Sequence, residues 1–359
     1  MMEENRAEQL FFLWEKISEG EIRLLRVFGE QPVVTVPGFI DGRCVRELGD
    51  YCFSRRKLPE NEIRYSRYCG GMWESGLSVL KDKEKKDRIS SEQEENIISL
   101  ETIERDGKLH ELSEKYIKEV QLPADIVKIG SCAFYNCTKM ERISVYPKLV
   151  EVGSDAFMNC LNLRSLRMCA GVEEPTGLKQ LLAQIKWQVE VSFEQEDGER
   201  EAVLMYPEYY ESYDEIGPAH IFELNLTGEG FRARQCFKDG VILLNAYDEI
   251  FPQACVEESA EVLIPMAWNR LYTACGLSPE ARAAYEVLTI LLKKRELKPL
   301  HFFFEKGYGR KEQIEDAVAI ASHEEWMEGV ASLIAWKRQL FAEPEKTADV
   351  KSRYSFEEF

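Results

Sequence analysis

Several features that are common in membrane proteins and in secreted disulfide-rich proteins are missing from this sequence. No apolar run reaches the roughly 18 residues that a membrane-spanning helix needs, so we expect no membrane insertion. The N-terminal segment lacks the basic start and apolar middle of a signal peptide, which favours a cytoplasmic protein. The ten cysteines are widely spaced in a long chain, a pattern typical of reduced thiols rather than of a disulfide framework.

Motifs that carry catalysis or hold cofactors are also missing. The glycines of residues 228–230 lie between expected strands and do not open a helix, as a phosphate or dinucleotide site requires. His323 begins a segment like a zinc-protease helix, but Met327 occupies the position of the second ligand. The four histidines are scattered, and no local spacing pairs a nucleophile with a base. We therefore expect no enzyme, cofactor or metal, although a site assembled from distant residues stays open.

Acidic residues are abundant, and they limit the classes of partner. The net charge is −18 with a pI near 4.9, so the mean field repels nucleic acid and anionic membranes. With 45% hydrophobic and 11% aromatic residues, the 359-residue chain has the composition of a folded protein with two or three cores. The expected partner is a protein or peptide, and the oligomeric state stays open.

The strongest pattern is a repeat at an offset of 23 residues. Residues 129–137, Ile-Gly-Ser-Cys-Ala-Phe-Tyr-Asn-Cys, align with residues 152–160, Val-Gly-Ser-Asp-Ala-Phe-Met-Asn-Cys. A fixed period in the twenties is typical of a solenoid, in which short units stack to bury a common core. The apolar residues that follow each motif keep the same offset and predict stacked parallel strands with these side chains inside: Met140, Ile143 and Val145, then Leu163, Leu166 and Met168.

Within each unit the motif residues have separate expected roles. Gly130 and Gly153 are expected in a tight turn where a side chain would clash. Phe134 and Phe157 are expected to fill the layer behind the strands, where the adjacent alanines allow close approach.

Residues 122–168 resemble the BspA-like leucine-rich repeats, whose units read roughly Leu-Pro-x-x-Leu/Val-x-x-Ile-Gly-x-x-Ala-Phe-x-x-Cys-x-x-Leu-x-x-Ile. Residues 33–54 match this pattern in part, with residues 48–53 in the place of 129–134, and we interpret them as a divergent first turn. The resemblance implies a curved parallel sheet that serves as a binding face, without catalytic residues. Members of the family are often found on cell surfaces, so a surface or secreted ligand-binding protein is the alternative.

Exposed strand positions form the candidate partner-binding face. Arg142 and Arg167 are expected one strand apart and predict a small basic stripe suited to an acidic or aromatic peptide. That these are ordinary solvated strand residues stays open. The face comprises Glu119, Gln121, Arg142, Ser144, Tyr146, Ser165 and Arg167, with Cys169 at its end.

Residues 171–250 predict a capping helix, 178–185, followed by a small antiparallel β module. Alternating apolar residues predict strands at 187–193 and 202–206 around a turn at Asp197-Gly198. Two further strands are expected at 220–226 and 231–236.

The segment 207–218 is expected to be a loop between strands and holds three tyrosines and four acidic residues. Tyr209, Tyr210 and Tyr213 are predicted to bind a partner, because surface tyrosines combine an apolar face with a hydroxyl. The acids suit a basic partner. Their spacing with His220 is not that of a metal site, so no metal is expected. A purely structural loop and an enzyme site at Tyr209–His220 are the alternatives.

The final third is expected to be helical. Residues 256–275 are interrupted by Pro265, which predicts a kink or split, and Ser278-Pro279 predicts a new helix. Further helices are expected at 298–306, 311–321 and 325–340. Residues 297–340 loosely resemble one ankyrin unit, through Pro299-Leu300-His301 and Gly307.

The sequence therefore predicts an α+β protein: a short leucine-rich-repeat solenoid, a small antiparallel β module and a C-terminal helical, loosely ankyrin-like region. Its predicted function is non-enzymatic binding of another bacterial or cellular protein, as a scaffold or adaptor. The predicted parts are an N-terminal region, 1–28, with an amphipathic helix at 7–18; a repeat region, 29–170, with a charged insertion at about 55–113; the β module, 171–250; the helical region, 251–342; and a tail, 343–359.

Overall fold

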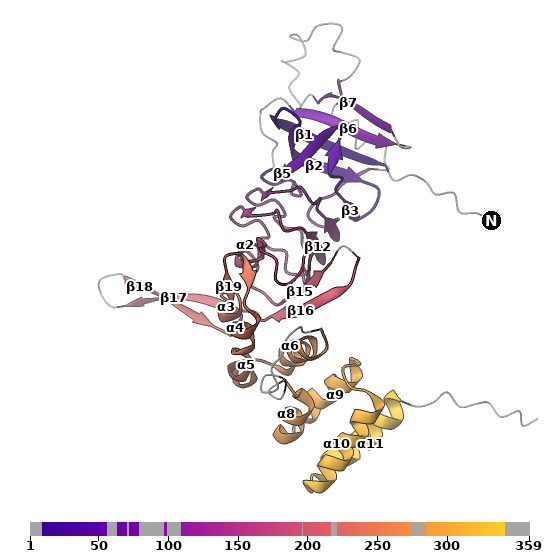
Figure 1. Ribbon diagram of the computed structural model, residues 1–359, viewed down its shortest axis with the longest axis vertical. Coiled ribbons are helices and arrows are strands. Elements are labelled where there is room, and N and C mark those ends of the chain that lie inside the picture. The colour runs from indigo at the N-terminus through magenta and orange to yellow at the C-terminus, as the bar shows by residue number, and fades with distance from the viewer. Residues whose placement is uncertain are drawn as a thin grey trace, which may run out of the picture.

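The computed structural model describes residues 9–55, 63–69, 72–78, 97–98, 109–195, 197–216, 221–273, 282 and 285–341. The charged run 81–95, the expected helix start at Ser278-Pro279 and the tail 343–359 lie outside these residues. The molecule is elongated, with a mostly antiparallel sheet at one end, stacked coils in the middle and helices at the other end (Figure 1).

Three parallel strands confirm the predicted stacking of residues 122–168. Strand β10, Glu119–Gln121, pairs with β12, Arg142–Val145, which pairs with β14, Ser165–Met168. Equivalent residues lie directly opposite one another, so that Ile143 is opposite Leu166. Both of these side chains are fully buried, as the repeat predicts.

The segment 33–54 is a complete coil of the same solenoid, as predicted. Its strand β3, Val33–Thr35, pairs in parallel with β10. On the other side of the coil, β5, Arg43–Leu48, pairs with β11, Lys128–Ile129, which pairs with β13, Glu151–Val152. The solenoid therefore has two rows of parallel strands with a core between them.

The repeated glycines allow adjacent coils to approach closely. A Cβ atom on Gly153 would lie 2.4 Å from the backbone nitrogen of Ser131, and one on Gly130 would lie 2.5 Å from that of Asp50. Neither glycine has a positive φ, so contact between coils rather than turn geometry requires them. The left-handed turn positions fall on other residues of the motif: Cys132, Asn136, Asp155 and Asn159.

The repeat sheet continues into the predicted β module. Strand β15, Val189–Glu194, pairs in parallel with β14, and β16, Arg200–Tyr206, returns antiparallel beside it. The turn at Asp197-Gly198 is confirmed. A separate β module is not confirmed, because the apolar side of β15 continues the solenoid core. Helix α2, Leu178–Ala183, thus lies in the connection between β14 and β15 instead of capping the last repeat.

The predicted N-terminal helix is wrong. Residues Leu10–Ser18 form strand β1, which pairs antiparallel with β2, Glu21–Gly29. Four consecutive apolar residues, 11–14, are buried because the strand has a core on each side. Phe12 and Trp14 pack into the main core, whereas Phe11 and Leu13 pack into a second, smaller one. Strand β2 is parallel to β5 and so ends the second row of the solenoid.

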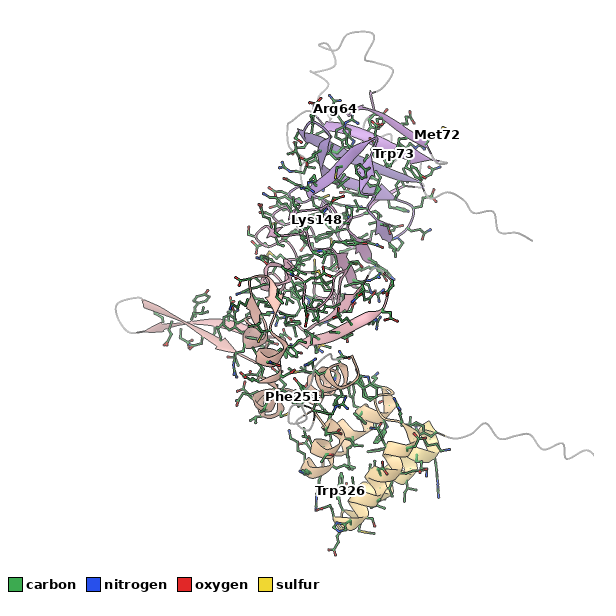
Figure 2. All side chains as sticks on the ribbon, in the orientation of Figure 1. Arg64, Met72, Trp73, Lys148, Phe251 and Trp326 are labelled. Atoms are coloured by element: carbon green, nitrogen blue, oxygen red, sulfur yellow. The ribbon has the colours of Figure 1, made fainter. Side chains whose placement is uncertain are left out.

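Further strands extend this N-terminal sheet. Strands β6, Ile63–Cys69, β7, Met72–Ser78, and β8, Ile97–Ile98, follow β1, giving the order β13-β11-β5-β2-β1-β6-β7-β8. The short strands β4, Phe39–Ile40, and β9, His110–Glu111, pair with β5 and β2. Figure 2 places Trp73 on this sheet and Phe251 and Trp326 among the helices.

Residues 207–218 and 231–236 differ from expectation. Strands β17, Tyr210–Ile216, and β18, Ile221–Thr227, form an antiparallel hairpin where a loop was predicted before β18. Residues 231–236, predicted as a strand, begin in helix α3, Gly230–Ala233. A small ladder of β19, Phe237–Lys238, and β20, Val241–Ile242, follows.

The C-terminal region is helical, as predicted. It begins with α4, Leu244–Asp248, α5, Phe251–Glu257, and α6, Ala260–Thr273. The helical segment is interrupted between α5 and α6, and Pro265 lies inside α6, so a split at Pro265 is wrong and a kink there stays a prediction. The fully buried neighbours Ile264 and Met266 hold the helix in place around the proline.

The last helices lie at the predicted positions. They are α8, Val287–Lys294, α9, Leu297–Glu305, α10, Lys311–His323, and α11, Met327–Leu340. The ankyrin-like character of 297–340 stays a prediction. In the described part of the chain, no helix combines the length and apolar character needed to cross a membrane.

Candidate binding groove on the parallel sheet

A groove of about 330 Å³ runs over the outer face of the sheet formed by β3, β10, β12, β14, β15 and β16. Six of the predicted site residues line it: Glu119, Gln121, Arg142, Ser144, Ser165 and Arg167. Sequence reasoning missed the contributions of the flanking strands, among them Val33, Thr35, Glu190, Ser192, Glu194 and Arg200. The continued alternation of residues 187–193 was the signal that β15 belongs to this sheet.

Strand register arranges the groove residues in two rows that cross the strands. Adjacent strands lie about 4.8 Å apart, so each row offers side chains at regular intervals. One row contains Val33, Glu119, Arg142, Ser165 and Glu190. The other contains Thr35, Gln121, Ser144, Arg167 and Ser192.

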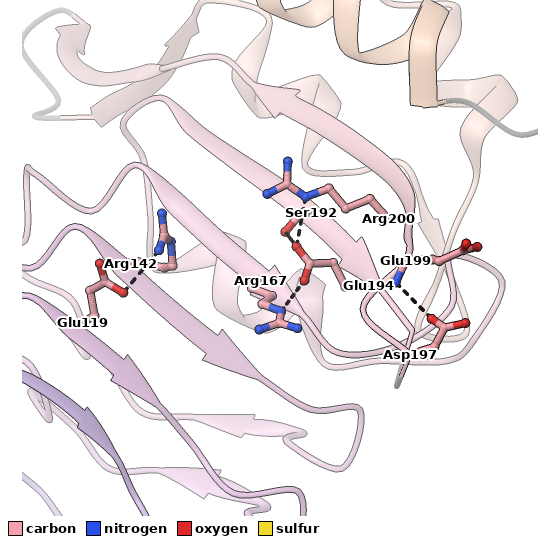
Figure 3. A network of polar contacts seen from close by, with 8 residues as sticks. All are labelled: Glu119, Arg142, Arg167, Ser192, Glu194, Asp197, Glu199 and Arg200. Atoms are coloured by element: carbon pink, nitrogen blue, oxygen red, sulfur yellow. Dashed lines mark hydrogen bonds and ion pairs between the residues drawn. The ribbon is translucent and has the colours of Figure 1, made fainter. Parts of the chain in front are cut away.

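Charged residues in the groove are paired with each other (Figure 3). The Arg142 guanidinium lies 3.2 Å from a Glu119 carboxylate oxygen. Glu194 forms ion pairs with two arginines: Arg167 Nε lies 2.5 Å from one oxygen, and Arg200 Nε donates to the other at 3.2 Å. Three arginines thus lie among three glutamates, because Glu190 also lines the groove. The predicted basic stripe is a charge-balanced network.

The paired groups differ in their access to solvent. The side chain of Glu194 is 10% exposed, whereas those of Arg142 and Arg200 are 51% and 64% exposed. Ser192 Oγ also donates to Glu194, at 3.2 Å. Glu194 therefore holds Arg167 and Arg200 from beneath the groove surface, and guanidinium N–H groups of the exposed Arg142 and Arg200 remain available to a ligand.

Helix α6 contacts the groove at its β15 end. Asn269 Nδ2 donates to Glu190 Oε2 at 3.0 Å. Burial raises the pKa of the Tyr308 hydroxyl, and the charge of Glu190 raises it further. Helix α6 thus contacts one of the side chains that line the groove.

The remaining predicted site residues lie elsewhere. Tyr146 does not line the groove, although it hydrogen-bonds to Cys169, the thiol of which has a pKa raised mainly by burial. Tyr209 is buried and packs edge-on to Phe231, 5.6 Å between ring centroids. Tyr210 and Tyr213 are exposed on the hairpin. The structure therefore does not join the tyrosines and the repeat face into one site.

Among the described side chains, no three His, Cys, Asp or Glu residues are placed to hold a metal ion. His220, which the alternative enzyme site would use, lies outside the described residues.

A family model agrees with the repeat architecture. Residues 95–175 match the family described as "BspA type Leucine rich repeat region (6 copies)". Among solved structures, the chain is similar to a leucine-rich cell surface protein from Faecalibacterium prausnitzii A2-165, at 15% sequence identity and a TM-score of 0.23. That similarity covers 44% of this chain and 35% of the other. No curated protein matches the sequence.

Proposed function

We propose that this protein, in which residues 95–175 match a BspA-type leucine-rich repeat region, is an interaction module that binds a protein or peptide segment in its groove. The observation that carries the proposal is the pair of rows of polar side chains that register holds across five parallel strands. Beneath them lies a closely packed core, so the groove is ordered before a ligand arrives and little conformational entropy is lost on binding.

The groove chemistry favours a polar segment with acidic side chains. Arg142 and Arg200 keep exposed guanidinium groups, which pair bidentately with carboxylates. Hydroxyl groups of Thr35, Ser144 and Ser192 lie in the row beside them and can donate to or accept from a ligand backbone. Glu119 and Glu190 also line the groove and favour basic residues in the same segment.

Charge reversal in the groove tests the proposal. The tagged protein is purified from its native cell beside an Arg142→Glu, Arg200→Glu variant, and co-purifying proteins are quantified by mass spectrometry. We expect the amount of at least one co-purifying protein to be lower by about tenfold or more with the variant, because two charge-assisted contacts become repulsive. That protein is then purified and its binding to both forms is measured directly.

Lys128→Glu provides the matched control. Lys128 is an exposed residue of the same solenoid, but it pairs with Glu151 in the other row of strands, away from the groove. This control must retain the captured protein. The proposal fails if wild-type protein and the groove variant capture the same proteins in equal amounts.

The proposed place of binding is the cytoplasm, with a cell-surface or secreted location as the alternative. The eight cysteines whose side chains the structure describes are free thiols, which suits a reducing compartment. Cell fractionation with alkylation of thiols before lysis tests the location. Recovery of the protein outside the cell, with its cysteines paired, would favour the alternative.

A further inference from the structure

The hairpin of β17 and β18 projects from the side of the molecule (Figure 1). Its strands pair along their full length, from Tyr210 opposite Thr227 to Ile216 opposite Ile221. Within the described residues they form a two-stranded sheet of their own. An isolated two-stranded hairpin is only marginally stable in water, so this projection needs support at its base or from a partner.

Arg234 supplies the support at the base of the hairpin. It is 2% exposed, and its guanidinium lies 5.1 Å from the centre of the Tyr209 ring. This single side chain ties the two hairpin ends to the end of the repeat sheet, so the direction of the hairpin is fixed. It donates to the carbonyl oxygens of Pro207, Gly230, Ile185 and Trp187, at 2.6, 2.8, 2.9 and 2.9 Å.

The strand register gives the hairpin two unlike faces. One face pairs Tyr213 with Leu224 and Glu211 with Leu226. On the opposite face Asn225 Nδ2 donates to Asp214 Oδ2 at 2.7 Å. We name Tyr213, Leu224 and Leu226 the apolar face of the hairpin; these side chains are 64%, 47% and 39% exposed. Single exposed leucines are ordinary, but adjacent apolar side chains on a projecting sheet are typical of a docking site.

The charge of the hairpin decides which partner fits. Residues 210–227 contain four carboxylates and no lysine or arginine. Lys186 at the base pairs with Glu211, with Nζ 2.6 Å from the carboxylate. A second copy of the hairpin would bring its own Glu211 and Glu215 to the apolar face, so repulsion opposes self-association. A basic surface would instead be attracted to it.

We propose that this hairpin docks a basic, amphipathic segment of a partner protein on its apolar face. Apolar side chains of the partner cover Tyr213, Leu224 and Leu226, and its lysines or arginines reach Glu211 and Glu215 beside them. The hairpin site is separate from the groove, so this proposal does not depend on the function proposed for the groove.

Synthetic peptides test this proposal on the full-length protein by fluorescence anisotropy. The probe alternates lysine and leucine. One control peptide has the same composition in scrambled order, and another alternates glutamate and leucine. We expect the alternating lysine peptide to bind at least about tenfold more tightly than the scrambled one, because only alternation places all leucines on the apolar face. The glutamate peptide should not bind.

Variants on the two faces locate the binding. The double variant Leu224→Ser, Leu226→Ser should lower the affinity for the lysine peptide by about tenfold or more. Tyr210→Ser, on the opposite face, should change that affinity by less than about twofold. Thermal unfolding shows whether each variant remains folded. Protection of the hairpin amides from hydrogen exchange, measured on wild-type protein with and without the peptide, gives a second readout that needs no variant.

Four results would overturn the proposal. Equal binding of the scrambled peptide would show attraction to the acidic chain as a whole. Retained binding by the double serine variant, or hairpin amides left unprotected by the peptide, would place the peptide elsewhere. Self-association abolished by the double serine variant would make a second copy the occupant of the apolar face.

Discussion

The ring of Phe53 stacks on the ring of Phe134, with centroids 4.8 Å apart and planes 11° apart, although residues 54–133 separate them in sequence. Phe134 stacks in turn on Phe157, at 5.2 Å and 3°. All three rings are fully buried. The stack joins the first coil to the two later ones and makes Phe134 the central contact of the solenoid.

Replacing Phe134 with alanine should lower the free energy of unfolding by about 3–5 kcal/mol, because both neighbouring rings lose a partner and a cavity remains. Urea unfolding followed by circular dichroism measures the change. Met158→Ala is the control, since this side chain belongs to the same motif but is exposed; it should change stability by less than about 0.5 kcal/mol. Equal effects of the two substitutions would contradict the stacking.

Gly153→Ala tests the approach of adjacent coils. The added methyl carbon would meet the Ser131 backbone nitrogen at 2.4 Å, and backbone cannot move aside without separating the coils. We expect a loss of about 3 kcal/mol or more in thermal or urea unfolding. Gly38→Ala is the matched control. The added methyl carbon would lie 3.8 Å from its nearest neighbour, the Cβ of Pro123, so this substitution should have little effect on stability. A stable Gly153→Ala protein would show that the coils can separate.

A buried ion pair should hold the first helices together. Asp248 in α4 accepts two hydrogen bonds from Arg270 in α6, both at 2.6 Å, and a third from the Tyr285 hydroxyl at 2.9 Å. Asp248→Ala leaves the Arg270 charge buried without its carboxylate and should cost about 3–5 kcal/mol in urea unfolding.

The exposed pair of Glu315 and Lys337 provides the comparison, with a nitrogen–oxygen distance of 2.7 Å. Glu315→Ala should cost less than about 1 kcal/mol, because solvent screens this pair. If Asp248→Ala were as mild as Glu315→Ala, the buried pair would have no role in holding α4 to α6.

Thiol reactivity should follow burial. Burial raises the pKa of Cys52 to about 12 and that of Cys236 to about 11, so at pH 8 the thiolate of Cys52 is about one part in ten thousand. We expect iodoacetamide to modify the partly exposed Cys44 and Cys132 first. Peptide mass spectrometry over time gives the order. Early modification of Cys52 in folded protein would contradict the packing of the first coil.

The sequence predicted the solenoid well because its constraints are local and repeat. Gly130 and Gly153 are required by contact with the preceding coil, and each coil meets the same neighbour. The same reasoning identified the divergent coil at 33–54. It also placed Arg142 and Arg167 on one face, but their partners were only partly foreseen, since Glu194 belongs to a strand that was assigned to another module.

The errors fall where the surroundings decide the structure. Residues 10–18 show an apolar spacing that fits a helix, yet a second core lies against the strand and buries Phe11 and Leu13 as well as Phe12 and Trp14. No local sequence pattern predicts that second core. Likewise, the tyrosines and acids of 207–218 suggested a loop, but β18 pairs with them along seven residues.

The two rows of the solenoid have different end strands: the groove row runs from β3 to β16, and the other row runs from β2 to β13. Between these ends, the strands of each coil pair with strands of the coils on either side. The span of the groove is therefore adjustable in whole units, and duplicating one 23-residue coil would lengthen it by about 4.8 Å while the end pieces keep their present neighbours. A groove built from such units can be matched to longer or shorter ligands without a change in either end of the solenoid.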